Sequence, residues 1–222
     1  RSQLVDVLDS RISLLIRNQY TTHTVSYSDI LSIKVGKRTA IDYMLDRTFL
    51  RPRDIIQFFN ACINQSDGKA KISRNALLAA EGIYSRERLR ALFDEWYGLY
   101  PNLEHLYLIL VEKNREFLLD SVTDVELQEN LLSLLVSGKG RPGIDLDLMK
   151  DMFDNNIDIH QYRKSIVHIL YKVSLIGLKI AKGFPISWSY SGGSSISISE
   201  INMNTRIIIH PMFFRVLGTT SD

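Results

Sequence analysis

The residues best placed to do chemistry are Arg51-Pro52-Arg53-Asp54, at the start of an apolar helix that runs on through Ile63. Proline suits the first helical position, because its missing N–H would be unpaired there. Asp54 complements the positive end of the helix dipole, whereas a cation in the first turn costs a few tenths to about 1 kcal/mol unless an anion lies nearby. Arg51 and Arg53 therefore predict a phosphate or carboxylate site. An ion pair with an acidic side chain elsewhere in the chain is the alternative.

Other motifs do not assemble a catalytic centre or a metal site. The segment 137–143 is rich in glycine but follows a helix and lacks the Gly-x4-Gly-Lys-Ser/Thr spacing of a P-loop, so we interpret it as a connector. No His-Glu-x-x-His or Gly-x-Ser-x-Gly pattern occurs. The acids of segment 145–158 do not follow EF-hand spacing and are typical of a solvated face. The sequence therefore predicts no catalytic residue and no metal ligand.

The composition is that of an ordinary globular chain. It has 222 residues, of which 45% are hydrophobic, with 27 basic and 25 acidic residues and a net charge of +2. Any affinity for nucleic acid must therefore come from local clustering. The single Cys62, within an apolar helix, predicts a buried hydrophobe and excludes an intrachain disulfide. No apolar run reaches about 18 residues, and no signal peptide is recognisable. We expect a cytoplasmic protein without a membrane segment, and the start at Arg1, inside an amphipathic pattern, predicts a piece of a longer protein.

The elements that would hold the two arginines are helical. Residues 1–118 predict an all-helical domain, beginning with an amphipathic helix over about the first 18 residues and two short helices over 27–34 and 38–45. After the central helix, Ser73 predicts a cap for a helix that ends near Gly82, and Ser85 predicts a cap for the next one. A further helix begins near Pro101.

Residues 119–222 predict a second domain, in which helices are followed by strands. Thr123 and Glu126 form a capping box before a helix of about three turns, and helices near 145–154 and 159–174 follow. Alternating apolar residues then predict strands over 186–190, 196–198 and 207–209. Three helices followed by a twisted hairpin indicate a winged helix-turn-helix. The expected fold class is mainly α, with a helical bundle followed by a winged helix that carries a small antiparallel sheet.

Charge is segregated within the second domain. Residues 120–158 hold nine acids against three bases, whereas residues 159–199 hold five bases and no acid. If the 159–174 helix is a recognition helix, one side of the winged helix could meet a phosphate backbone. The alternatives are internal attraction between the acidic and the basic helices, or a winged helix used for protein contacts. The candidate nucleic-acid-binding residues are Arg163, Lys164, Lys172, Lys179 and Lys182.

Four segments together carry a resemblance to a known family: 47–60, which contains Arg51-Pro52-Arg53-Asp54, then 72–73, 84–89, and 208–214 with Ile208-Ile209-His210-Pro211. From about Arg38 to Leu217 the chain resembles the C-terminal half of bacterial P-loop ATPases of the AAA+/STAND type, with a KAP-like or origin-recognition-like layout. That layout comprises an α/β ATPase core, a helical lid and a C-terminal winged helix. The chain lacks the Walker A and Walker B motifs, so the resemblance implies that the core precedes Arg1.

The resemblance implies a nucleotide-sensing role for Arg53, in the position of a sensor 2 arginine, with Arg51 as a neighbour that could substitute for it or pair with an acid. The fragment alone would not hydrolyse ATP; ATP and Mg²⁺ would be held by the N-terminal ATPase core of the same polypeptide. Phage defence or DNA transactions are the implied settings, with DNA or a protein effector as partner. The alternatives are a DNA-binding winged-helix module, or a protein-interaction or homo-oligomerisation domain that uses the exposed face of the first helix.

Overall fold

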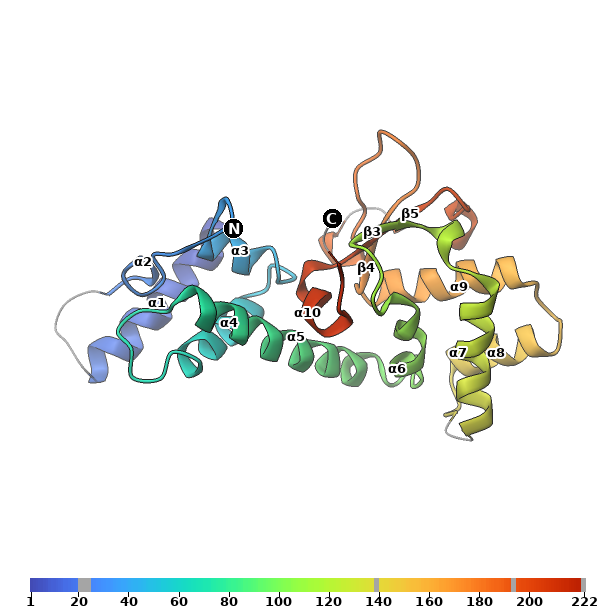
Figure 1. The fold of residues 1–222 in the computed structure, drawn as a ribbon, viewed down its shortest axis with the longest axis horizontal. Coiled ribbons are helices and arrows are strands. Elements are labelled where there is room, and N and C mark those ends of the chain that lie inside the picture. The colour runs from blue at the N-terminus through green and yellow to red at the C-terminus, as the bar shows by residue number, and fades with distance from the viewer. Residues whose placement is uncertain (20–24, 138–139, 193–194, 221–222) are drawn as a thin grey trace. The chain divides into compact units, whose positions relative to one another are not determined.

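The computed structural model of the chain describes residues 1–19, 25–137, 140–192 and 195–220. They form two compact units, Arg1–Glu87 and Arg88–Asp222, and helix α5 (Arg74–Trp96) contributes residues to both. Most of the described chain is helical, with small antiparallel sheets (Figure 1). This confirms the predicted fold class. The predicted domain boundary near residue 118 stays a prediction.

The first unit is built on two long helices, α1 (Ser2–Gln19) and α4 (Pro52–Asn64), which pack against each other. From α1, Leu4, Leu8 and Ile12 are buried at helical spacing, as the amphipathic pattern predicted. Pro52 begins α4, also as predicted, and the side chains that α4 buries are apolar apart from Asp54. Burying each large apolar side chain stabilises the fold by about 1.5–3 kcal/mol. The buried residues of α4 are Asp54, Ile55, Phe58, Phe59 and Cys62.

Between α1 and α4 the chain forms short elements. Helix α2 covers only Tyr27–Ile30, and a hairpin of β1 (Lys34–Val35) and β2 (Arg38–Thr39) leads into α3 (Ala40–Leu45). The predicted helices over 27–34 and 38–45 are therefore wrong for residues 31–34 and 38–39. Gly36, with φ of 61°, adopts the left-handed conformation that a tight hairpin turn needs and that a helix does not contain.

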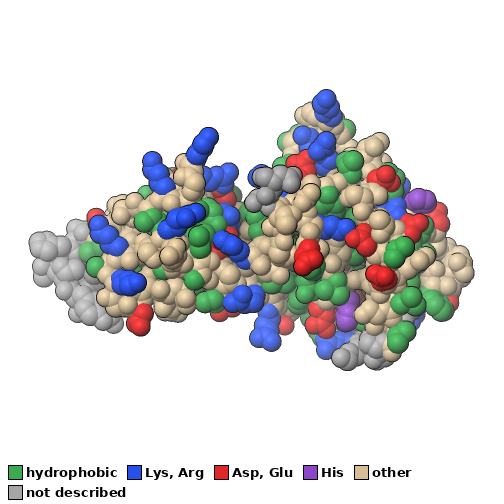
Figure 2. Space-filling view, viewed as in Figure 1, with side chains coloured by type: hydrophobic (Ala, Val, Ile, Leu, Met, Phe, Trp, Pro, Cys, Tyr) green, Lys and Arg blue, Asp and Glu red, His purple; other side chains and the backbone are tan. Residues whose placement is uncertain are grey.

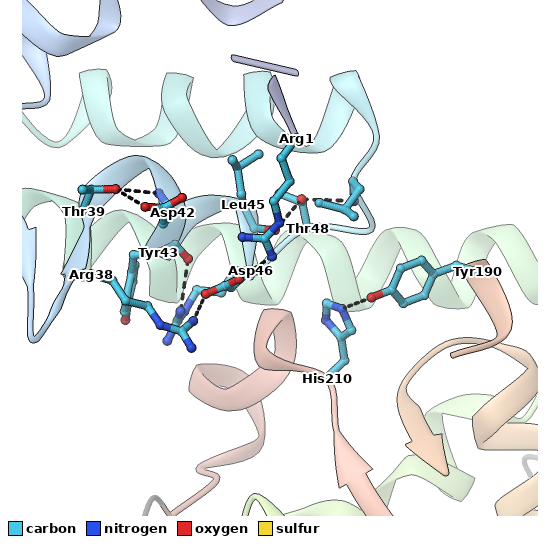
Figure 3. Close-up of polar contacts among 12 residues, drawn as sticks. Arg1, Arg38, Thr39, Asp42, Tyr43, Leu45, Asp46, Thr48, Tyr190 and His210 are labelled. Atoms are coloured by element: carbon cyan, nitrogen blue, oxygen red, sulfur yellow. Dashed lines mark hydrogen bonds and ion pairs between the residues drawn. The ribbon is translucent and has the colours of Figure 1, made fainter. Parts of the chain in front are cut away.

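Side-chain contacts fix the ends of α3 (Figure 3). At its start, the Thr39 hydroxyl accepts a hydrogen bond from the backbone N–H of Asp42 at 3.2 Å. At its end, Asp46 accepts from the Arg1 guanidinium at 2.6 Å and also pairs with Arg38. Because the arginines of these ion pairs are exposed, each pair contributes at most about 1 kcal/mol.

Helix α5 continues without interruption through Gly82 and Ser85. The predicted end near Gly82 and the new cap at Ser85 are therefore wrong, although the Ser73 hydroxyl does cap the start by accepting from the N–H of Ala76 at 3.1 Å. Ser85 is fully buried, and the neighbouring Tyr84 stacks on Phe58 with ring centroids 4.6 Å apart. Tertiary packing of this face outweighs the modest helix-breaking tendency of glycine and serine.

The second unit contains a three-stranded antiparallel sheet in the order β3-β5-β4. Its strands are β3 (Glu116–Leu118), β4 (Ile176–Lys179) and β5 (Arg206–Ile209), and Ile207 lies between Phe117 and Leu178 in the register. Strand β3 and the hairpin of the first unit contradict the prediction that residues 1–118 are all helical. The remaining elements before β3 are helix α6 (Leu103–Leu106) and the 3-10 helix η1 (Tyr107–Leu110).

Three α-helices lie between β3 and β4, in the order that the sequence predicted for a winged helix. They are α7 (Asp124–Ser137), α8 (Ile144–Phe153) and α9 (Ile159–Lys172). The predicted capping box before α7 is confirmed, since the Thr123 hydroxyl accepts from the N–H of Glu126 at 3.2 Å and Glu126 accepts from the N–H of Thr123 at 2.9 Å. Of the predicted connector 137–143, Gly138 and Lys139 lie outside the described residues.

Of the three strands predicted for the wing, 207–209 is confirmed as part of β5, and 186–190 and 196–198 are wrong. Residues 189–191 and 198–200 form the 3-10 helices η3 and η4, and only Ser187 forms a bridge, with Leu178. The alternating aromatic residues of this segment gather around a buried histidine instead: Trp188 lies edge-on to His210 with ring centroids 5.0 Å apart, and the hydroxyl of Tyr190 lies 3.1 Å from His210 Nε2 (Figure 3). After β5, η5 (Pro211–Phe213) and α10 (Phe214–Leu217) complete the unit.

Candidate functional site

The turn before α4 is held by two polar side chains. The Thr48 hydroxyl donates to the Leu45 carbonyl at 2.8 Å and accepts from the Leu50 N–H at 3.1 Å (Figure 3). Asp54 is fully buried and accepts from the Phe49 N–H at 3.1 Å. These bonds hold the backbone of Leu50 at φ 53°, a left-handed conformation that residues other than glycine rarely adopt. Asp54 therefore faces inward and fixes the turn, while the two arginines that precede it, Arg51 and Arg53, are exposed.

The two arginines of the turn lie in different surroundings. Arg51 is the N-cap residue of α4, and its guanidinium carbon lies 5.5 Å from the centroid of the Phe49 ring, a cation–π distance. Arg53 is exposed in the first turn and lines a groove. No hydrogen bond or ion pair joins Arg53 to another residue within the described ranges. The structure therefore separates the two predicted nucleotide-sensing residues, and only Arg53 reaches the groove.

The groove lies within the first unit, between α1, α4 and α5, and has a volume of about 540 Å³. One face of α4 supplies Arg53, Gln57, Asn60 and Asn64 at spacings of four, three and four residues, which is one stripe of a helix. Gln57 Nε2 donates to Glu87 Oε2 of α5 at 3.2 Å. The full lining is Arg11, Arg53, Ile56, Gln57, Asn60, Ala61, Asn64, Gln65, Ile83 and Glu87.

Charges in the groove favour an anion. Arg11 and Arg53 both line it, and Glu87 is the one acid among its lining residues. Arg11, like Arg53, has no ion pair with any residue that the structure describes. The unit as a whole contains 13 Lys and Arg against 9 Asp and Glu. Over this unit, on the face in Figure 2, basic side chains predominate over acidic ones. The groove can therefore bind phosphate or carboxylate without first breaking an internal ion pair of its own arginines.

Two parts of this site were absent from the sequence predictions: Arg11 and the amide side chains of α4. The stripe of Arg53, Gln57, Asn60 and Asn64 could have been found by projecting α4 on a helical wheel. Arg11 gave no local signal, because only the packing of α1 on α4 brings it to the groove.

Comparison with known proteins gives one finding. Residues 2–93 match the FunZ-associated C-terminal helical domain. The matched segment contains every residue that lines the groove. No curated protein and no solved structure is similar enough to the chain to count as a match. Residues 2–93 are thus similar to a C-terminal helical domain of a larger protein, which supports the coarser part of the resemblance; AAA+ or STAND parentage does not follow from that description.

The five bases of the predicted nucleic-acid surface do not form one exposed patch. Arg163 is only 4% exposed and pairs with Asp124 at the start of α7. Lys164 and Lys179 are half-buried, whereas Lys172 and Lys182 are exposed. Helix α9 buries nine of its fourteen residues, so little of its surface is left for a groove of DNA. Attraction between the acidic and the basic helices, one of the alternatives that the sequence left open, is present in the pair of Arg163 with Asp124.

Other side chains that could take part in chemistry are buried and have structural roles. Burial, with Glu81 nearby, raises the pKa of the Cys62 thiol to about 12, which leaves it protonated and unreactive at neutral pH. Asp145 is fully buried and accepts from the Asn102 N–H at 2.6 Å and from Asn102 Nδ2 at 3.0 Å. Across the described ranges, no three His, Cys, Asp or Glu side chains gather as a metal site would need.

Membrane insertion has no candidate helix. Among the residues whose structure is described, none of the helices combines the length and apolar character that crossing a bilayer requires.

Proposed function

We propose that this chain is the C-terminal regulatory part of a P-loop ATPase of the AAA+/STAND type, in which Arg53 contacts the phosphates of ATP bound to a preceding core. The observation that supports the proposal most directly is the exposed guanidinium of Arg53, which faces a groove and has no acidic partner among the described residues. The match of residues 2–93 to a C-terminal helical domain agrees with such a position in a longer polypeptide.

The chemistry asked of Arg53 is electrostatic. A guanidinium offers two parallel N–H donors to a phosphate and stays charged at any physiological pH. In the proposed protein, ATP and Mg²⁺ are held by the Walker motifs of the core, which this chain lacks. Arg53 then bonds the terminal phosphate only while ATP is present, so hydrolysis releases the helical unit. The winged helix would report this change of position to DNA or to a protein effector, in phage defence or in a DNA transaction.

The first test is ATP turnover by the full-length polypeptide with Arg53→Ala. We expect kcat to fall about tenfold or more, which corresponds to about 1.4 kcal/mol or more at the transition state. Arg51→Ala is the matched control, because Arg51 lies two residues before Arg53 and its guanidinium lies near the Phe49 ring, outside the groove. Unchanged turnover in a folded Arg53→Ala protein, or an equal loss in the control, contradicts the proposal.

A protein-interaction or homo-oligomerisation role is the second candidate. Val7 and Leu14, seven residues apart on α1, are 40% and 63% exposed and so lie on one exposed face of that helix, two turns apart. Light scattering over a concentration series tests it. A dimer that dissociates on substitution of Leu14 by Asp favours this role, and a strict monomer at all concentrations excludes homo-oligomerisation.

A further inference from the structure

The groove contains a second cation, which the sequence did not indicate. Leu8 and Ile12 direct one side of α1 into the core against α4, and Arg11, next to Ile12, lines the groove from the α1 side. Arg53 lines it from the start of α4. Two helices that are far apart in sequence thus contribute one guanidinium each to the same hollow.

Two guanidinium groups in one hollow repel each other unless an anion lies between them. Both side chains are exposed, so water and salt weaken this repulsion without abolishing it. The one carboxylate in the lining, that of Glu87, is engaged by the side-chain amide of Gln57 at 3.2 Å. An anion with more than one charged group would relieve the repulsion and satisfy both arginines together.

The rest of the lining fits a ligand larger than a simple ion. The volume of about 540 Å³ lies within the range of roughly 300–1,000 Å³ that is typical of small-molecule sites. Ile56 and Ile83 supply apolar surface, and the amides of Gln57, Asn60 and Asn64 offer both donors and acceptors. A chain of phosphates attached to a flat polar ring has this combination of charge, apolar surface and hydrogen-bonding groups.

We propose that the groove between α1, α4 and α5 is a polyphosphate-binding site of nucleotide size, in which Arg11 and Arg53 share the phosphates and the α4 amides face the remainder of the ligand. This deepens the proposed function and rests on it for the source of the nucleotide, which would be the ATPase core. The site itself needs only this chain. Through Arg11, α1 would respond to the nucleotide together with α4. Loss of the phosphates would release α1 and α4 from the ligand that they share.

The experiment is an NMR titration of the 222-residue chain with inorganic tripolyphosphate, repeated with ATP. We expect weak, saturable binding of tripolyphosphate, with shifts at Arg11, Arg53 and the α4 amides. Arg11→Ala and Arg53→Ala should each weaken it severalfold, and the double variant should lose it. Arg74→Ala is the control, because Arg74 is exposed at the start of α5 and does not line the groove. Equal affinity in all variants, or an equal loss in Arg74→Ala, overturns the site.

The two proposals fail separately. One outcome is that tripolyphosphate binding depends on Arg11 and Arg53 while Arg53→Ala leaves ATP turnover of the full-length protein unchanged. In that case the binding site is supported and its coupling to hydrolysis is wrong. If ATP binds the isolated chain with a micromolar constant, the nucleotide comes from solution and the core-held source is wrong. Weak binding of ATP that is weakened further in Arg11→Ala supports the core as the source.

Discussion

Gln57 of α4 donates a hydrogen bond from Nε2 to Oε2 of Glu87 on α5 at 3.2 Å, across the wall of the arginine-lined groove. The bond orients the one carboxylate in that lining, yet it does not remove the negative charge. The groove is consequently a site in which cations outnumber anions by one, and the balance can be changed by a single substitution.

Glu87→Gln should raise the affinity of the groove for tripolyphosphate. The change keeps a side chain that can bond Gln57 but removes a negative charge from the lining, and we expect about a twofold to fivefold gain because the site is open to solvent. Titration at low and high salt measures it, since screening should reduce the gain at high salt. Asp6→Asn, which removes an exposed acid outside the groove, is the matched control; a gain of the same size there would mean that only net charge matters.

Asp54→Ala should destabilise the first unit. It leaves the Phe49 N–H without its carboxylate acceptor and removes a buried side chain, for a loss of about 1–3 kcal/mol in the free energy of unfolding. Urea denaturation followed by circular dichroism gives the value. Asp42→Ala offers a comparison at an exposed first-turn acid of α3 and should cost less. An undisturbed midpoint for Asp54→Ala would show that the turn does not depend on this bond.

Asp145 and Glu126 should give the second unit opposite pH responses. Burial raises the pKa of Asp145 despite its hydrogen bonds from Asn102, so its contribution is fully present below its unfolded pKa, near 4, and is lost as pH rises through the folded value. Partial burial opposes ionisation of Glu126, but the bonds from Lys113 and Thr123 prevail and lower its pKa. Its contribution is therefore lost as pH falls through that lowered value.

The two responses are separated by measuring the free energy of unfolding between pH 2.5 and 7. The measurement is made on the wild type, Asp145→Asn and Glu126→Gln. The advantage of wild type over Asp145→Asn should shrink as pH rises, and its advantage over Glu126→Gln should shrink as pH falls. Parallel curves for wild type and Asp145→Asn would contradict the raised pKa of Asp145.

Arg163→Ala should affect stability more than nucleic-acid affinity. Its guanidinium is buried against Asp124, so removing it leaves an unpaired acid and a gap in the core of the second unit.

If the winged helix does bind DNA, the exposed Lys172 and Lys182 should carry the salt dependence, and neutralising both should reduce the slope of log K against log salt by about two. Fluorescence anisotropy checks this. A loss of DNA affinity in Arg163→Ala that leaves stability unchanged would reverse the assignment.

Sequence patterns predicted the elements whose signals are local. Pro52 and the apolar face of α4, and the reciprocal pair of Thr123 and Glu126, identify their helices correctly because the determining residues lie within one turn of each other. The predicted helix cap at Ser85 was wrong, because this serine is buried by tertiary packing that the local sequence does not show. The alternation around Trp188 was equally ambiguous, because an aromatic cluster on His210 and a strand produce the same period.

The candidate site shows the same division. Arg53 could be found from its position at the start of a helix, and the α4 amides from their spacing. Arg11 could not be found, because its place in the groove depends on how α1 packs on α4.

The left-handed backbone at Leu50 changes which amino acids that position can accept. Glycine, and to a lesser degree asparagine, should be the replacements that survive in a saturation-mutagenesis library, although leucine is the larger and more apolar residue. Valine and isoleucine, closest to leucine in hydrophobicity, should be depleted because their branched Cβ clashes in this conformation. A substitution matrix that scores residues by chemical likeness would rank the alternatives at residue 50 in nearly the reverse order.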